Sequence, residues 1–156
     1  DNPLVVLASA DHPLSREKKI SIERICDEPF IMREPGSGTR MATERFFLEH
    51  SHKLKVRMEL GSNEAIKQAI VGRLGIAVLS RHTLALDAPM GQLEILDVEG
   101  FPIERHWYFA YPSGKQLSIV AQTFLEYLRQ ASDYLDDLSC RHAISGHCPL
   151  LKDGQH

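Results

Sequence analysis

The chain has 156 residues, of which 43% are hydrophobic and 25% charged, a balance typical of a globular protein. Its 18 basic and 21 acidic residues give a formal net charge of −3, which excludes a strong positive field for a polyanion, so direct DNA binding by this chain is not expected. No apolar run reaches the length of a membrane span and no signal-peptide pattern is present, so we expect a cytoplasmic protein without membrane contact.

The first half of the chain alternates predicted strands with predicted helices. Residues 4–8 form a continuous apolar run, which favours a strand buried on both faces, as in a parallel sheet. A strand of this kind so early in the chain needs neighbours, and we therefore expect a fragment of a larger protein. Residues 30–32 predict a second buried strand and 38–50 a helix. The strict alternation at 54–60 predicts a strand with one solvated face or a place near a sheet edge.

The second half continues this alternation. A helix after Gly61 is followed by predicted strands at 76–79, 93–96 and 103–111, the last rich in aromatic residues. Together these elements predict an α/β sheet with right-handed crossovers. The segment 117–138 predicts one helix with an apolar seam, which packs either on the sheet or on a second copy of the chain. From residue 139 the periodicity is lost, and a frayed tail is expected.

A loop between the strand at 30–32 and the following helix is the first candidate binding site. Its sequence, EPGSGTR at 34–40, contains two glycines just before the helix begins. A helix start has unpaired N–H groups and partial positive charge, so such a loop can hold an anion, with an arginine as an additional two-pronged partner. The alternative is an ordinary turn between a strand and a helix, with Ser37 or Thr39 as the N-cap. The candidate residues are Gly36, Ser37, Gly38, Thr39 and Arg40.

A second helix start, Gly61-Ser62-Asn63, repeats this arrangement after the next strand. The carboxyl ends of strands in an open α/β sheet face the ligand crevice, so both helix starts can line one pocket, although Ser62 is equally suited to be a simple N-cap. No nucleotide P-loop and no catalytic elbow are present, so Ser80 and His82 are not expected to form a nucleophilic site. Residues 140–148 contain two cysteines and two histidines whose spacing matches no common zinc site, and no metal is expected.

Several motifs occur in an order that is quite specific, although each is weak by itself. They are DHPL (11–14), EPGSGTR (34–40), GSNEAIKQAI (61–70), LGIAVLS (74–80) and YPSGKQLS (111–118). Over about residues 3–135 the chain resembles the effector-binding region of LysR-type transcriptional regulators. The stretches REPGSGTR, LSRHTLAL and VEGFPIERHWY are similar to the subgroup that regulates RuBisCO and Calvin-cycle operons. One departure is Arg73, which stands where the family usually has glycine; we expect it either to strain the end of the second helix or to indicate a different helix stop.

The resemblance implies an α/β fold like that of type II periplasmic binding proteins, with one complete Rossmann-like lobe and part of a second lobe. Residues 1–10 would end regulatory lobe I and form a crossover strand, and 11–110 would form regulatory lobe II. Residues 111–138 would return as the second crossover and a helix on lobe I, and 139–156 would be a disordered tail. The DNA-binding winged helix and the first half of lobe I are expected to be missing.

The resemblance also implies a function without enzymatic activity. The expected effector is a small anionic metabolite such as a phosphorylated sugar, phosphoenolpyruvate or NADPH, bound in the cleft between the lobes to control carbon-fixation genes. The residues expected to hold it are Gly36, Ser37, Gly38, Thr39, Arg40, Ser62, Asn63 and, as a further candidate, Arg33. Other expected partners are DNA, through the missing N-terminal domain, and further copies in a dimer or tetramer. The alternative function is a free-standing type II solute-binding protein for an anionic metabolite.

Overall fold

The computed structural model describes residues 1–84, 91–108, 110–114 and 116–141, with side chains described up to residue 131. The strands are β1 (Leu4–Ser9), β2 (Pro29–Arg33), β3 (Lys55–Leu60), β4 (Ala77–Ser80) and β5 (Leu93–Ile95). The helices are α1 (Ile22–Cys26), α2 (Gly38–Glu49), α3 (Asn63–Val71) and α4 (Ile119–Arg141), with short 3-10 turns at Pro13–Arg16 and Arg81–Leu84. The predicted alternation of strands and helices is therefore confirmed up to β5.

The strands form one mixed arrangement with β1 near its centre. β4 and β5 flank β1, and both run antiparallel to it, whereas β2 and β3 pair in parallel. A bridge between Phe30 and Ile76 joins the two parts just before β4, which gives the order β3-β2-β4-β1-β5. At this junction Gly75 has φ +156°, and a Cβ there would overlap the carbonyl oxygen of Pro29. The expectation that β1 lies in a parallel sheet is therefore wrong, although it is buried on both faces as predicted.

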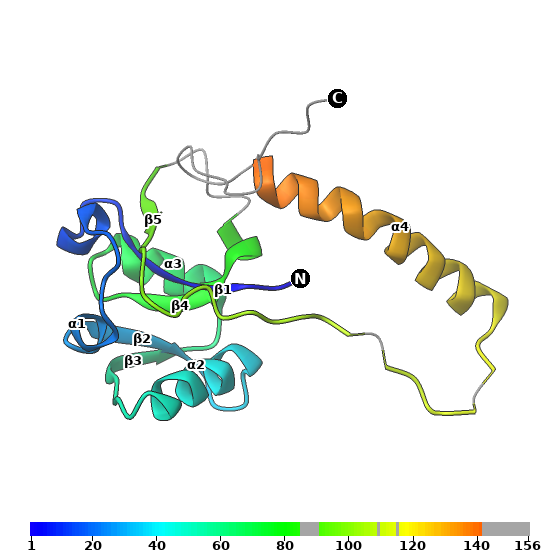
Figure 1. Cartoon of the computed structure of the whole chain (residues 1–156), viewed down its shortest axis with the longest axis horizontal. Helices are drawn as coiled ribbons and strands as arrows, with labels where there is room; N and C mark the ends of the chain where they lie inside the picture. Colours follow the sequence, from blue (N-terminus) through cyan, green and yellow to red (C-terminus); the bar gives the residue numbers. More distant parts are fainter. Residues whose placement is uncertain (85–90, 109, 115, 142–156) are drawn as a thin grey trace.

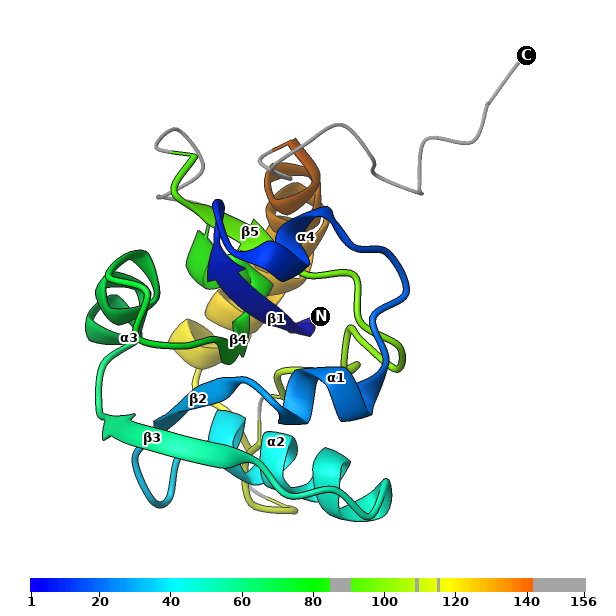
Figure 2. The same ribbon diagram turned by 90° about the vertical axis from the view of Figure 1, so that its left-hand side faces the viewer.

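Two hydrophobic clusters cover opposite faces of this sheet. Leu4, Val6 and Ala8 of β1 belong to the cluster that includes Ile25 of α1 and Phe47 of α2. Val5 and Leu7 belong to the other cluster, together with Ile66 and Ile70 of α3. Successive side chains of a strand point to opposite faces, so a fully apolar β1 is what a sheet with helices on both sides requires. Figure 2 shows α3 on one side of β1 and β4, and α1 and α2 on the other.

β3 lies at the edge of the sheet, where β2 is its pairing partner. Its residues are exposed or only partly buried, which agrees with the alternating sequence and its predicted place near an edge. The end of α3 also follows the sequence analysis, because Arg73 has φ +59°, the left-handed conformation that the family's usual glycine would adopt more easily. An ion pair between Arg73 and Asp11 links this turn to the loop after β1.

The segment after β5 does not form the strand predicted at 103–111. Within the described residues its backbone pairs through Ile103 with Leu4 and through Arg105 with Asn2. A strand needs a partner along its length, and this segment leaves the sheet after Arg105, so Trp107 and Tyr108 are mostly exposed. Phe109 lies outside the described residues, as does nearly all of the predicted tail.

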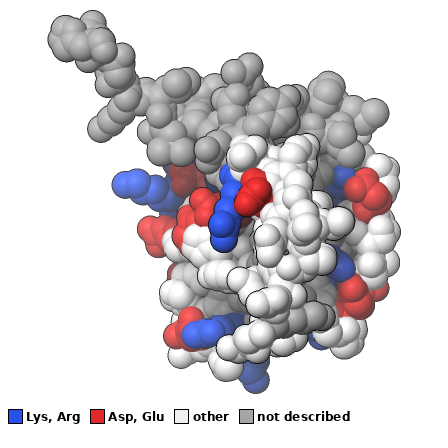
Figure 3. Space-filling model, turned by 90° about the vertical axis from the view of Figure 1, so that its right-hand side faces the viewer, with Lys and Arg blue, Asp and Glu red and all other residues white. Residues whose placement is uncertain are grey.

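The predicted long helix is present as α4, but it does not pack on the sheet. Figure 1 shows α4 standing apart from the body that carries the strands, at the end of an extended connection. Where side chains are described, the surface on this side of the molecule is mostly uncharged, with a few charged side chains between uncharged ones (Figure 3). The exposed large apolar residues of the connection and α4 are Trp107, Tyr108, Tyr111, Ile119, Val120, Phe124 and Tyr127. Among the described residues, no helix combines the length and apolar character that a bilayer span needs.

Candidate functional site

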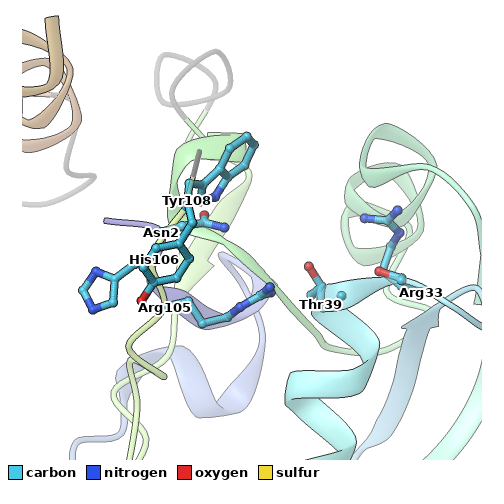
Figure 4. A pocket seen from close by; sticks show the side chains of 9 residues that line it. Asn2, Arg33, Thr39, Arg105, His106 and Tyr108 are labelled. Atoms are coloured by element: carbon cyan, nitrogen blue, oxygen red, sulfur yellow. The ribbon is translucent and has the colours of Figure 1, made fainter. Parts of the chain in front are cut away.

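A pocket of about 440 Å³ lies where the loop between β2 and α2 faces the segment that follows Ile103. Figure 4 shows Arg105 extending from this segment toward Thr39 at the beginning of α2, with Arg33 on the far side of Thr39. Two separate parts of the chain therefore contribute to one site. The lining residues are Asn2, Arg33, Ser37, Gly38, Thr39, Arg105, His106, Trp107 and Tyr108.

The beginning of α2 supplies hydrogen-bond donors that have no acceptor within the helix. Ser37 is the N-cap residue, and the carbonyl of Ser37 accepts from the N–H of Met41. The N–H groups of Gly38 and Thr39 precede this first helical bond and have no acceptor within α2. The Ser37 side chain does not cap the helix, although Ser37 is only 9% exposed and lines the pocket. The Ser37 hydroxyl and the N–H groups of Gly38 and Thr39, which have no acceptor within α2, thus meet at the positive end of a helix.

Gly36 shapes the turn that leads into this helix rather than lining the pocket. Its φ of +89° is strained for any residue with a Cβ atom, although no other atom occupies the space where that Cβ would be. The Ser37 N–H donates to the carbonyl of Glu34, which closes the turn. The glycine therefore has a conformational role here, and its backbone need not approach a ligand.

Arg33 lines the pocket but its charge is already compensated. Its Nε and Nη2 atoms donate to the two carboxylate oxygens of Glu34 at 2.7 and 2.9 Å. These hydrogen bonds are the main reason that the pKa of Glu34 is lowered and that of Arg33 is raised. The remaining Nη1 donates to the side-chain oxygen of Asn63 at 2.7 Å. Arg33 can still present a donor edge to a ligand, but it adds little net positive charge.

Arg40 lies outside the pocket. It forms ion pairs with Glu44 at 2.7 Å and with Glu59 of β3 at 2.8 Å, and it also donates to the carbonyl of Arg33. These hydrogen bonds raise the pKa of its guanidinium. The arginine that completes the EPGSGTR motif therefore ties α2 to β2 and β3.

The start of α3 also lies outside the pocket. The hydroxyl of Ser62 accepts from the N–H of Ala65 at 3.4 Å, which is the N-cap arrangement that the sequence left open. Asn63 reaches the pocket only through Arg33, whose guanidinium it holds. Of the predicted residues, the structure brings Arg33, Ser37, Gly38 and Thr39 together, and it does not bring Gly36, Arg40, Ser62 or Asn63 to the pocket.

Arg105 is the main lining residue that the sequence analysis did not select. A Cβ atom placed on Gly38 would lie 3.2 Å from the Nη2 atom of Arg105, so the guanidinium reaches the first turn of α2. Among the described residues, no carboxylate forms an ion pair with it. The available signal was a lone arginine inside the aromatic stretch 103–111, which we had assigned only to a strand.

The described residues contain no group of three or more histidine, cysteine or carboxylate side chains suited to a metal ion. The cysteines and histidines considered as zinc ligands at 140–148 lie outside the described side chains. Ser80 donates its hydroxyl to the side chain of Asn2, while the ring of His82 contacts the carbonyl of Asp1. These contacts connect the chain's first residues to the end of β4.

Comparison with known proteins identifies the family. The model of the LysR substrate binding domain matches residues 1–133. The chain belongs to this LysR family. It is 63% identical over 128 residues to the HTH-type transcriptional activator CmpR of Synechocystis, and 58% identical over 132 residues to the RuBisCO operon transcriptional regulator of Acidithiobacillus ferrooxidans. These alignments cover 82% and 85% of this chain but only 42% and 43% of the relatives, so the chain spans less than half of their length.

Solved structures confirm the fold class. The regulatory domain of CcmR from Synechocystis PCC6803, solved in complex with 2-PG, matches with a TM-score of 0.80 and 55% sequence identity, over 83% of this chain and 62% of that one. The effector-binding domain of QuiR matches with a TM-score of 0.66 at 19% identity, over 85% of this chain and 63% of that one, which bears on the fold alone. The fold is thus that of LysR regulatory domains, which are like type II periplasmic binding proteins, and it is partial in this chain.

Proposed function

We propose that this chain is the effector-sensing part of a LysR-type transcriptional regulator of carbon-fixation genes, and that its pocket binds a small phosphorylated anion. The observation that carries the proposal is the open start of α2. Ser37 is buried and faces the pocket without capping the helix, and the guanidinium of Arg105 lies opposite. A phosphate group can accept hydrogen bonds from the Gly38 and Thr39 N–H groups and from Ser37.

The choice of ligand follows from the chemistry of the pocket and from its relatives. A phosphate matches a helix start and a guanidinium, because both present several converging donors to a group with several acceptor oxygens. The CcmR regulatory domain, 55% identical to this chain, was solved with 2-PG, which is 2-phosphoglycolate. We therefore take 2-phosphoglycolate as the first effector to test. Ribulose 1,5-bisphosphate, phosphoenolpyruvate and NADPH follow as competitors for the same pocket.

The same geometry suggests how binding is transmitted. Arg105 lies near the end of lobe II, and its carbonyl accepts from the Asn2 N–H at 2.7 Å, so the end of this lobe is tied to the crossover segment 1–10. A ligand held between α2 and Arg105 is therefore bound within lobe II (11–110), beside the crossover segment 1–10. Binding then favours one lobe arrangement, which changes transcription only if the effector has different affinities for the two arrangements.

The other parts of the proposed function concern the intact protein. The relatives are transcriptional regulators, so we propose that this chain works without catalysis and in the cytoplasm. DNA would be bound through an N-terminal domain, and the regulator would act as a dimer or tetramer. In the division that we propose, α4 with residues 111–118 returns to lobe I, and the exposed apolar side chains of the connection and α4 would be covered there. A free-standing solute-binding protein is not favoured, since the relatives control operons.

A binding titration tests the proposal. We would titrate 2-phosphoglycolate into the isotope-labelled chain at constant ionic strength and follow the backbone amides by NMR. Saturable shifts at residues 37–39, absent with glycolate at the same concentration, are the expected result. Glycolate is the matched ligand because it lacks only the phosphoryl group. Shifts that are absent, or equal for both ligands, would overturn the assignment of a phosphate site to α2.

A further inference from the structure

We infer that Arg105 is the charge-selecting residue of this pocket, so that it determines the preference for a doubly charged phosphate group over an equally shaped anion with one charge less. The inference rests on the proposed function, since it concerns the same pocket. It goes beyond that function by assigning selectivity to one side chain, which lies on the segment 103–108 rather than in the EPGSGTR loop.

The charges around α2 single out Arg105 from three arginines. The charge of Arg33 is balanced by the bidentate contact with Glu34, and that of Arg40 by Glu44 and Glu59. Arg105 lines the pocket, and among the described residues it has no carboxylate partner. An uncompensated guanidinium gains more from a dianion than from a monoanion, because the Coulomb energy scales with the product of the charges.

A second, independent observation shows that this side of α2 is prepared for a ligand. Ser37 is more than nine-tenths buried, lines the same pocket and makes no side-chain hydrogen bond to its own helix. The hydroxyl oxygen of an N-cap serine usually accepts a hydrogen bond from an N–H group of the first helical turn. A serine hydroxyl at a pocket that does not do so is available to hydrogen-bond a ligand. The backbone N–H groups and Ser37 provide hydrogen bonds, while Arg105 provides the net charge.

The absence of a side chain at Gly38 leaves room for the close approach of Arg105. Gly38 is exposed, and a side chain there would press on the guanidinium at 3.2 Å. Such a contact is tighter than ordinary van der Waals separation, so an alanine there would require the guanidinium to shift by a few tenths of an ångström. The hydrogen bond between the Arg105 carbonyl and the Asn2 N–H keeps the backbone of this arginine in place. The guanidinium is therefore directed at α2 from a tethered position.

The test compares two ligands of the same shape and different charge. At pH 8, 2-phosphoglycolate carries a phosphate dianion, because phosphate monoesters lose their second proton near pH 6, whereas the sulfate ester of glycolate carries a sulfate monoanion. Dissociation constants for both are measured by NMR on the full chain and on the variants Arg105→Gln, Arg105→Lys and Arg45→Gln. Arg45 is the matched control, since it is exposed on α2, pairs with Glu49 and lies outside the pocket.

We expect the unaltered chain to prefer the phosphate ester. Arg105→Gln should weaken the binding of 2-phosphoglycolate about tenfold. The affinities for the phosphate ester and the sulfate ester should then be nearly equal. Arg105→Lys should retain part of the preference, because it keeps the charge but loses the two-pronged geometry. Arg45→Gln should leave both affinities unchanged. The amide spectrum of each variant, compared with that of the unaltered chain, shows that the fold is intact.

Other outcomes separate this inference from the proposed function. If the chain binds 2-phosphoglycolate at residues 37–39 but Arg105→Gln keeps both the affinity and the ratio, the inference is wrong and the proposed function stands. The inference is also wrong if Arg45→Gln loses as much affinity as Arg105→Gln, since any lost charge would then have the same effect. If the unaltered chain binds neither ester, both proposals are overturned together.

Discussion

The two helix starts at α2 and α3 look alike in sequence and differ in how their serines are used. Ser37 and Ser62 each follow a strand and a glycine-containing turn, and each is the N-cap of its helix. The Ser62 hydroxyl accepts from the Ala65 N–H and is exposed, whereas the Ser37 hydroxyl makes no cap bond and belongs to a buried residue that lines a pocket. An N-cap residue is therefore available to a ligand only where its side chain does not cap the helix.

The largest expected difference between the two helix starts is in how much an alanine at the glycine of each turn changes the free energy of unfolding. Gly36 has φ +89°, while Gly61 has no left-handed φ and open space around its Cβ position. Gly36→Ala should lower the free energy of unfolding by about 1 to 2 kcal/mol because of the strained backbone. Gly61→Ala should leave it unchanged or raise it by up to about 1 kcal/mol, since alanine reduces the freedom of the unfolded chain. Urea unfolding followed by circular dichroism measures both, and equal effects of the two substitutions would contradict the contrast.

Local patterns in the sequence were enough to predict most of the helices and strands. The bounds of α2 and α3 were predicted to within about two residues, because capping residues and apolar spacing mark helix ends directly. The direction of β1 was not predictable, since a continuous apolar run indicates burial on both faces and does not say how the neighbours run. The segment 103–111 alternates like a strand, but strand formation also depends on a partner, which the sequence pattern does not reveal.

For a similar reason the sequence named only four of the nine residues that line the candidate pocket, Arg33, Ser37, Gly38 and Thr39. Ser37, Gly38 and Thr39 are adjacent in sequence, so one motif identifies all three. Arg105 approaches them from a segment more than sixty residues later, through a tertiary contact that no local spacing encodes. Arg40 was selected because arginine is a good phosphate ligand, but its contacts with Glu44 and Glu59 depend on where α2 meets β3.

Substitution of the two N-cap serines should have smaller effects, on stability at Ser62 and on ligand binding at Ser37. Ser62→Ala should lower the free energy of unfolding by about 0.5 to 1 kcal/mol, because it removes the cap of α3, and it should leave 2-phosphoglycolate binding unchanged. Ser37→Ala should change the free energy of unfolding less than Ser62→Ala does, since no cap bond is lost. It should weaken the binding of 2-phosphoglycolate several-fold. Thermal unfolding and the NMR titration measure these effects on the same samples. Weaker ligand binding in Ser62→Ala with no change in Ser37→Ala would reverse the assignment of the two helix starts.

Glu34 allows the charge balance at α2 to be changed in the opposite direction. Hydrogen bonds from Arg33 lower the pKa of the Glu34 carboxyl, so Arg33 is neutralised in the free protein. Glu34→Gln removes that compensation and leaves Arg33 as a second net charge at the pocket. We expect 2-phosphoglycolate to bind about two- to fivefold more tightly, the range of a partly exposed ion pair. Glu44→Gln, which removes a partner of Arg40 outside the pocket, is the control and should leave the affinity unchanged.

The same substitution has a consequence for acid stability. A carboxyl whose pKa is lower in the folded state stabilises that state above its unfolded pKa, and the contribution disappears as the pH falls through the folded pKa. The stability of the unaltered chain should therefore decrease more steeply below about pH 4.3 than that of Glu34→Gln. Urea midpoints between pH 3 and pH 6 measure this difference, which is small because the Glu34 side chain is 41% exposed. If Glu34→Gln instead weakens the binding of 2-phosphoglycolate, the contact with Glu34 serves mainly to hold Arg33 in position for the ligand. The position of the Arg33 guanidinium, rather than that of Arg105, would then matter most for the affinity.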